Sequence, residues 1–537
     1  MSGRLLHHWV DEAAARAPNV PAFRMRDDEI TYERLARKSD QLAALLIEGG
    51  VRPGDRVGLY LNKSLETPVA LFGVLKAGAA YAPLDPTAPM SRTAAVMREC
   101  GVRALITHEP KARAAETLLS TENLGDDFAL VIGAAAPPAA SLRAISWSAL
   151  DAAPSLDEPD RTEDDIAYII FTSGSTGAPK GITHTHRSGV AYALAAAELY
   201  EVSPDSRLSN HSPLHFDMST FDYLSGPCAG ACTVIIPEAY AMLPASMSTL
   251  IEQERFTHWY SVPFALIQLL EHGALDQRDL ASLRWVMFGG EPFPAKYLRA
   301  LRAHMPNATF SNVYGPAEVN QCTYHHVLQE DFAAETPPPI GKTWAIADGI
   351  QLDEHDAIMN TGSIGELAIA SDTMMEGYWG RGDLNAKAFY TRIGDDGAKT
   401  KYYRTGDIVR DLGDGIYEFV GRKDRQTKVR GYRVELEEVE SVISAVAGVS
   451  EAAAVIIEGA SGSAEIASSF TAQMDDGDDL INRIQSAVAE KLPVYAAPAH
   501  LERIASFPRT TSGKIDRNAV ARQFSIAKSE EAIAHAG

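Results

Sequence analysis

Cysteine is scarce in this chain: Cys100, Cys228, Cys232 and Cys322 are the only four among 537 residues. So few cysteines do not form a disulfide framework, and they fit a reducing cytoplasm. Cys228 and Cys232 lie close together, but no His/Cys pair follows them at zinc-ligand spacing. The pattern therefore favours small buried side chains over a metal site.

Long apolar runs and a targeting segment are also missing. The chain has no uninterrupted apolar run of about 18 residues, and it does not start with a cationic segment followed by an apolar core. We therefore expect a cytoplasmic protein that is neither secreted nor membrane-spanning. Basic residues are outnumbered, 49 against 71 acidic ones, for a net charge of -22. This balance argues against nucleic acid or an anionic membrane as the partner.

What is present is an ordinary globular composition, 46% hydrophobic and 22% charged, in a chain too long for one core. Strand patterns such as Val57–Leu61 alternate with helical patterns, which predicts βαβ units and a mostly parallel sheet, an α/β fold. Residues 134–160, rich in Ala, Pro and Ser, are expected to be a surface connection. A densely charged stretch at 421–430 suggests a boundary near Asp424, giving a large domain 1–423 and a small mixed α/β domain 424–537.

The segment 168–181 joins a buried strand pattern to a Gly/Ser/Thr loop that carries one lysine. Glycines allow close backbone approach, while hydroxyls, loop N–H groups and an ammonium suit a polyphosphate. The glycine spacing differs from both G-x-x-x-x-G-K-[ST] and G-x-G-x-x-G. We predict a nucleotide phosphate loop made by Thr172, Ser173, Gly174, Ser175, Thr176, Gly177 and Lys180.

This loop resembles that of the adenylate-forming superfamily, which includes acyl-CoA synthetases, luciferases and the adenylation domains of nonribosomal peptide synthesis. Further motifs follow in the family's order across nearly the whole chain. In Asn312–Glu318, the resemblance implies that Tyr314 stacks on the adenine of ATP and that Glu318 helps to hold Mg²⁺. Ala317 departs from the family, which usually has threonine there, so its phosphate contact must be absent or supplied elsewhere.

Three later motifs extend the resemblance. In Tyr403–Asp407, Asp407 is implied to accept hydrogen bonds from the ribose hydroxyls. In Gly421–Asp424, Arg422 would lie near the ribose, and Asp424 would be the hinge about which a mobile C-terminal domain turns. In Arg509–Arg517, Lys514 is implied to be the main catalytic residue, stabilising negative charge in the transition state.

The stretch His215–Asp222 indicates the acyl substrate. By similarity to amino-acid adenylation domains, Asp217 pairs with the substrate's α-ammonium, a carboxylate that fatty and aryl acid ligases generally lack. The family's specificity positions fall on a set with no second charge and several bulky members, which predicts a small neutral side chain. The substrate-binding set is Asp217, Met218, Phe221, Tyr260, Met287, Gly289, Val313, Gln321 and Cys322.

The sequence thus predicts a stand-alone, AMP-forming amino acid–carrier protein ligase of natural-product biosynthesis, similar to prolyl and alanyl ligases. It would use ATP and Mg²⁺, favour L-proline or L-alanine, and pass the aminoacyl group to the phosphopantetheine thiol of a separate carrier protein. Basic residues at 423–433 or 503–517 could dock an acidic carrier. The alternatives are a D-alanine carrier-protein ligase, an acyl- or aryl-CoA ligase, and a non-catalytic protein on the same fold.

Overall fold

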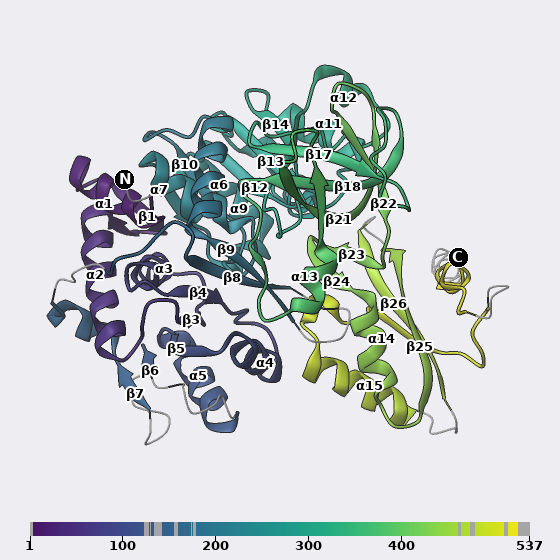
Figure 1. The fold of residues 1–537 in the computed structure, drawn as a ribbon, viewed down its shortest axis with the longest axis horizontal. Helices are drawn as coiled ribbons and strands as arrows, with labels where there is room; N and C mark the ends of the chain where they lie inside the picture. Colours follow the sequence, from purple (N-terminus) through teal and green to yellow (C-terminus); the bar gives the residue numbers. More distant parts are fainter. Residues whose placement is uncertain are drawn as a thin grey trace. The chain divides into compact units, whose positions relative to one another are not determined.

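The structure, a computed structural model, describes residues 4–122, 128, 130–133, 142–154, 159–172, 174, 179–459, 463–472, 478–509 and 514–524. The chain separates into two compact units, whose elements are labelled in Figure 1. The first comprises Met1–Pro86, Met97–Phe171 and Gly181–Lys423. The second comprises Thr87–Val96, Thr172–Lys180 and Asp424–Gly537.

One sheet has the order β19-β9-β8-β4-β3-β5-β6-β7 and is mainly parallel, because helices connect most of its strands. This matches the predicted βαβ pattern. Its strands are β3 (Arg56–Leu59), β4 (Ala80–Pro83), β5 (Val102–Ile106), β6 (Leu130–Ile132), β7 (Arg143–Ile145), β8 (Ile166–Thr172), β9 (Lys180–Thr185) and β19 (Gly377–Tyr378).

A second sheet, again mainly parallel, has the order β16-β15-β14-β13-β12-β10-β11-β1-β2. Its strands are β1 (Pro21–Met25), β2 (Asp28–Thr31), β10 (Arg207–Asn210), β11 (Cys232–Ile235), β12 (His258–Ser261), β13 (Trp285–Gly289), β14 (Thr309–Tyr314), β15 (Thr323–His326) and β16 (Lys342–Thr343).

Helices precede, connect or follow the strands of these sheets, and some of them supply the parallel crossovers. They are α1 (His8–Arg16), α2 (Tyr32–Glu48), α3 (Glu66–Lys76), α4 (Met90–Cys100), α5 (Glu109–Thr121), α6 (His186–Leu199), α7 (Gly226–Ala229), α8 (Glu238–Ala241), α9 (Pro244–Glu254), α10 (Pro263–His272), α11 (Ala295–His304), α12 (Gln329–Ala333) and α13 (Gly382–Ala388). Short turns of other helix types are η1 (Trp147–Ala152), the π-helix η2 (Phe221–Ser225) and η3 (Leu275–Gln277).

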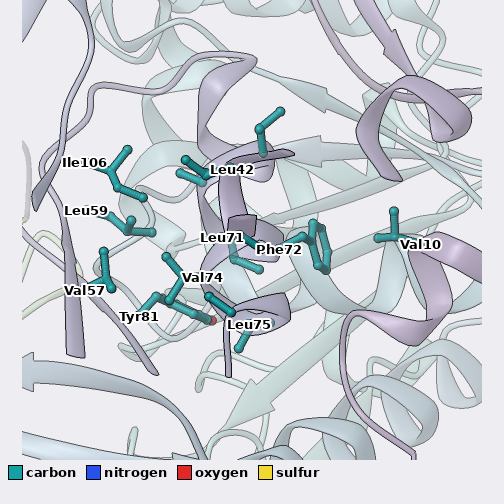
Figure 2. Packing of buried hydrophobic residues seen from close by; sticks show 14 of the residues in the cluster. Val10, Leu42, Val57, Leu59, Leu71, Phe72, Val74, Leu75, Tyr81 and Ile106 are labelled. Carbon is teal, nitrogen blue, oxygen red and sulfur yellow. The ribbon is translucent and has the colours of Figure 1, made fainter. Parts of the chain in front are cut away.

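The hydrophobic core of the first sheet forms where α2 and α3 cover its strands. Figure 2 shows Val57 and Leu59 of β3 on one side of Leu71 and Leu75 of α3. The α3 sequence is apolar almost all round, and every residue from Thr67 to Lys76 is buried, as expected for a helix enclosed in a core.

Two parts of the first unit differ from the sequence-based expectation. A third sheet, β17-β18-β21-β20 with β22 beside β21, is wholly antiparallel, and hairpin-like pairing of long strands replaces helical crossovers there. Its strands are β17 (Ala347–Leu352), β18 (Ile364–Ser371), β20 (Phe389–Ile393), β21 (Lys399–Asp411) and β22 (Tyr417–Arg422).

The expected surface connection at 134–160 is also partly wrong. Residues 134–141 and 155–158 lie outside the described residues, but between them β7 adds an edge strand and η1 follows. Leu150 of η1 is fully buried in the core, so this segment is part of the packed domain. Its short apolar run was hidden by the surrounding Ala, Pro and Ser residues.

The second unit has its own apolar core and two antiparallel or mixed sheets, β23-β24 and β25-β26-β27. Its elements are β23 (Gln426–Val429), β24 (Tyr432–Glu435), α14 (Leu436–Ser444), β25 (Val449–Glu458), β26 (Ala464–Ala472), α15 (Asp478–Lys491), η4 (Val494–Ala496) and β27 (His500–Arg503). Across the described residues of both units, no helix is long and apolar enough to cross a membrane.

Candidate active site

The predicted phosphate loop lies between two strands, β8 and β9. Ser173, Ser175, Thr176 and Gly177 lie outside the described residues, while Gly174 is buried. The Thr172 hydroxyl is buried and has no hydrogen-bond partner among the described residues, as expected of a group that would bind an absent phosphate oxygen. Lys180, in the second unit, places its Nζ 3.2 Å from Oε1 of Glu435 of the same unit.

Tyr314, Asp407 and Arg422 meet in the first unit. The Tyr314 hydroxyl donates to Oδ2 of Asp407 over 2.5 Å, and the Arg422 guanidinium donates to Oδ1 over 2.5 Å. Asp407 and Arg422 face each other in the register of β21 and β22, so strand pairing positions the ion pair. Burial, reinforced by the Asp407 charge, raises the pKa of Tyr314. The arrangement places a buried carboxylate beside an aromatic ring, and these are the two residues predicted to contact the ribose and the adenine.

Glu318 lies in a buried polar group behind this pair. The hydroxyl of Tyr378 donates to Oε1 of Glu318 over 2.7 Å, and Tyr403 lies 3.3 Å from the Tyr378 hydroxyl. Glu318 is fully buried. The described residues contain no cluster of three or more His, Cys, Asp or Glu side chains that could hold a metal ion. A Mg²⁺ at Glu318 would therefore take most of its oxygen ligands from substrate phosphates and water, which is its usual mode of binding.

The backbone before Glu318 is fixed by a histidine that the sequence did not reveal. Nε2 of His184 lies 2.9 Å from the Ala317 carbonyl oxygen, and Nδ1 lies 3.2 Å from the Ser188 hydroxyl. Burial lowers the pKa of His184 to about 4, so the ring is neutral at physiological pH. The neutral ring of His184 therefore orients the Ala317 carbonyl without adding a positive charge beside Glu318.

The predicted substrate-binding residues largely converge in one buried cluster beside the second sheet. Phe221, Tyr260, Met287 and Val313 belong to it, and Met218 packs against it. Parallel pairing places Tyr260 opposite Met287 and Gly289 opposite Val313, because β12, β13 and β14 are neighbours. The rest of the cluster includes Tyr192, Tyr200, Trp285 and Trp344.

Gly289 and Cys322 complete the lining in different ways. A Cβ on Gly289 would lie 2.2 Å from the carbonyl oxygen of Val313, so only glycine fits without moving the backbone. Cys322 is fully buried and packs in the neighbouring cluster with Tyr378 and Tyr403. Burial raises the pKa of its thiol, so it is a small apolar side chain and not a reactive thiolate.

Gln321 is oriented by two tyrosines that sequence reasoning missed. Its Nε2 donates to the Tyr200 hydroxyl over 2.7 Å, and the Tyr192 hydroxyl donates to its Oε1 over 3.4 Å. All three side chains are buried. The two tyrosines therefore take up much of the polar capacity of the Gln321 amide, which keeps this part of the cluster mainly apolar.

Asp217 stands in the loop between β10 and η2. Its Oδ1 accepts from the N–H of Met218 over 3.0 Å, and its carbonyl oxygen accepts from the Thr220 hydroxyl over 2.5 Å. The Asp217 charge also acts on the buried hydroxyls of Tyr192 and Tyr260. The Asp217 carboxylate is thus positioned next to the apolar cluster, and the buried Asp222 acts on the same two tyrosines.

Lys514 and Asp424 both belong to the second unit. Lys514 is exposed, beside a bridge that pairs Arg509 with Ile515. Asp424 accepts the N–H of Gln426 over 3.2 Å where this unit begins. Several of the basic residues considered for carrier docking have acidic partners: Arg425 and Arg517 both bind Glu440, and Arg509 binds Glu451.

Comparison with known proteins agrees with this architecture. Residues 10–379 match the model of the AMP-binding enzyme family, and residues 438–514 match that of the AMP-binding enzyme C-terminal domain. The chain therefore belongs to the AMP-binding enzyme family, and it is a ligase of the adenylate-forming type.

Two relatives and one solved structure are similar to this chain over nearly its whole length. An L-proline–[L-prolyl-carrier protein] ligase of Pseudomonas fluorescens is 34% identical over 522 residues, which cover 97% of this chain and 99% of that protein. A protein of the same name from Streptomyces coelicolor is 33% identical, covering 94% of each. The solved amide bond synthetase McbA of Marinactinospora thermotolerans is 25% identical with a TM-score of 0.84, covering 97% of this chain and 100% of that one.

Proposed function

We propose that this enzyme activates a small neutral L-amino acid with ATP and then loads it onto a carrier protein. L-proline is the first choice and L-alanine the second. The observation that carries the proposal is Asp217 beside a buried apolar cluster that offers no second charged side chain from the predicted set. The two L-proline–[L-prolyl-carrier protein] ligases, similar over almost their full length, support the same choice.

The chemistry proceeds in two steps. First, a carboxylate oxygen of the amino acid attacks the α-phosphorus of ATP, the bond to the bridging oxygen breaks, and pyrophosphate leaves with an aminoacyl-AMP remaining. Second, the phosphopantetheine thiol of the carrier attacks the acyl carbon, AMP leaves, and the thiol proton is released. The protein supplies no nucleophile in either step, so its contribution is positioning and electrostatic stabilisation.

The residues divide this work. Asp217 binds the α-ammonium, Tyr314 stacks on the adenine, and Asp407, held by Arg422, accepts from the ribose hydroxyls. Thr172 and Lys180, with the loop between them, bind phosphate oxygens, and Lys514 stabilises charge on the group being transferred. Glu318 would hold Mg²⁺, which when bound neutralises phosphate charge.

The test is amino-acid-dependent exchange of pyrophosphate into ATP, with both enantiomers of the proteinogenic amino acids, cyclopentanecarboxylic acid and several aryl and fatty acids. We expect a strong signal with L-proline. Asp217→Asn should lower kcat/KM for it by about 10- to 100-fold, because a charge-assisted contact is lost. Asp205→Asn, on an exposed turn before β10, is the matched control and should retain activity.

Other outcomes separate the alternatives. Signal with D-alanine alone would indicate a D-alanine carrier-protein ligase. Signal only with acids that lack an amino group would contradict the role of Asp217 and identify an acyl- or aryl-CoA ligase. No exchange with any acid would contradict the proposal as a whole.

A further inference from the structure

A buried lysine outside the predicted site is tied to the loop that carries Asp217. Lys63 lies just before α3, and its Nζ donates to the carbonyl oxygen of Asn210 over 3.0 Å and also to that of His211. These carbonyls stand at the end of β10, where residues 211–220 leave the sheet towards Asp217 and η2. A segment far away in sequence thus fixes the first end of the loop.

The second end of the same loop is joined to the first through Asn210. The Asn210 amide donates to Oδ2 of Asp222 over 3.0 Å and to the Ser212 carbonyl oxygen over 3.1 Å. The hydroxyl of Tyr223 donates to Oδ1 of Asn210 over 3.3 Å. Asp222 and Tyr223 belong to η2, so one network closes residues 211–220 at both ends.

Within the loop, further hydrogen bonds transmit this anchoring to Asp217. The Ser219 hydroxyl donates to the carbonyl oxygens of Leu214 and Phe216, over 3.2 and 2.6 Å. The Thr220 hydroxyl donates to the backbone carbonyl oxygen of Asp217. These bonds connect the two anchored ends of the loop to the backbone around Asp217.

Burying the charged ammonium of Lys63 costs free energy, which its interactions with the protein must offset. Burial lowers the pKa of Lys63 to about 8, while the charges of Asp222 and Glu238 oppose that shift. The adjacent cavity, lined by Lys63, Thr67, His215, Tyr223 and Glu238 among others, has a volume of about 20 Å³. It has room for about one water molecule, and the hydrogen-bond partners of the Lys63 ammonium are carbonyl oxygens of the protein. The ammonium acts on the protein itself.

We propose that Lys63 is a positioning residue for amino-acid recognition, holding the loop 211–220 so that Asp217 meets the substrate's α-ammonium. This inference rests on the proposed function, because it takes Asp217 as the ammonium partner. Removing the ammonium takes one donor from each of the two carbonyls at the end of β10, although the Asn210 carbonyl keeps the N–H of Ile236. It also removes a positive charge that favours ionised Asp222. The loop then relaxes, and the contact that distinguishes amino acids from other acids weakens first.

The experiment compares Lys63→Met, Lys63→Arg and the wild type in pyrophosphate exchange. It measures the ratio of kcat/KM for L-proline to that for cyclopentanecarboxylic acid, which has a similar ring but no amine. Lys63→Met should reduce this ratio about 10- to 100-fold with an unchanged KM for ATP, since small misplacements of a positioning group have effects of that size. Lys63→Arg, which keeps a cation, should restore part of the ratio.

Lys76→Met is the matched control, because Lys76 is also a buried lysine with acidic partners, Asp11 and Asp40. It should lower the melting temperature but leave the ratio unchanged. Hydrogen exchange should be faster across residues 211–220 in Lys63→Met and not in Lys76→Met. This readout does not depend on the substrate.

The outcomes are distinguishable. If Asp217→Asn collapses the ratio but Lys63→Met leaves it at the wild-type value, the inference about Lys63 is wrong and the proposed function stands. If both substrates lose activity equally in Lys63→Met, Lys63 has only a structural role. A wild-type enzyme with no preference for the amine overturns both.

Discussion

At the scale of single residues, some polar groups of the predicted site each form hydrogen bonds with two neighbouring side chains. Asp407 takes hydrogen bonds from both Tyr314 and Arg422, so its carboxylate is already oriented before any nucleotide arrives. Orienting a charged acceptor in advance lowers the entropy cost of binding. The Gln321 amide is likewise oriented in advance, by hydrogen bonds with Tyr192 and Tyr200.

Asp407→Asn should raise the KM for ATP about 10- to 100-fold, because the amide is a weaker acceptor for ribose hydroxyls than a carboxylate. The enzyme's preference for ATP over 2′,3′-dideoxy-ATP should largely disappear in the variant. Asp348→Asn is the control, because Asp348 likewise accepts from a tyrosine, Tyr402, elsewhere on the third sheet. An undiminished preference in Asp407→Asn would count against a ribose contact.

At the scale of elements, the buried cluster that contains most of the predicted substrate-binding residues results from the strand order. β12, β13 and β14 come from separate βα units, yet their parallel register places Tyr260, Met287 and Val313 in one cluster. Gly289 lets β13 and β14 approach at the end of that cluster. The backbone spacing at Gly289 is therefore part of how this cluster packs.

Gly289→Ala should destabilise the protein by about 1–3 kcal/mol, because the added Cβ meets a carbonyl oxygen and the strands must separate. The KM for L-proline should rise while that for ATP stays close to the wild-type value. Urea unfolding and pyrophosphate exchange measure the two effects. Gly382→Ala, where a Cβ has no neighbour within 4 Å, should change neither KM. A fully stable, active Gly289→Ala protein would show that the strands tolerate the shift.

At the scale of the whole molecule, stability should depend on buried neutral histidines. Burial lowers the pKa of His258 to about 4 and that of His211 to about 3, both below the ordinary 6.5. Between pH 6.5 and 4 the unfolded chain therefore binds protons that the folded chain does not, so stability falls as the pH falls. Asp222 acts in the opposite direction, because burial raises its pKa.

His258→Gln isolates one such contribution. Lowering the pH from 7.5 to 5.5 should destabilise the wild type by about 1.4 kcal/mol more than the variant, the value of one proton over the one pH unit between the unfolded pKa of 6.5 and pH 5.5. Urea unfolding at both pH values measures the difference. The variant retains an amide able to donate to the Tyr200 carbonyl, which His258 contacts at 2.7 Å. An equal pH dependence in both proteins would mean that His258 titrates normally in the fold.

Sequence reasoning predicted the parallel α/β architecture, since apolar strand patterns such as those of β3 and β8 alternate with helical patterns. It did not predict the third sheet or β7. The antiparallel pairing of β18 with β21 joins segments that are far apart in sequence, so a local sequence pattern does not reveal it. β7 has only three residues, which is too short for a recognisable strand pattern. The predicted roles of the site residues stay predictions until the variants are measured.

The family of this protein can be recognised from its amino-acid sequence alone, because the motifs around Lys180, Glu318 and Lys514 are short contiguous segments. The residues that orient the predicted site from distant parts of the chain can be found only in the tertiary structure. Lys63, His184 and Tyr200 carry no motif, and each acts on a segment distant in sequence through a carbonyl or amide buried with it. Such partners follow from desolvation: a polar group taken out of water must find whatever donor or acceptor the fold brings beside it.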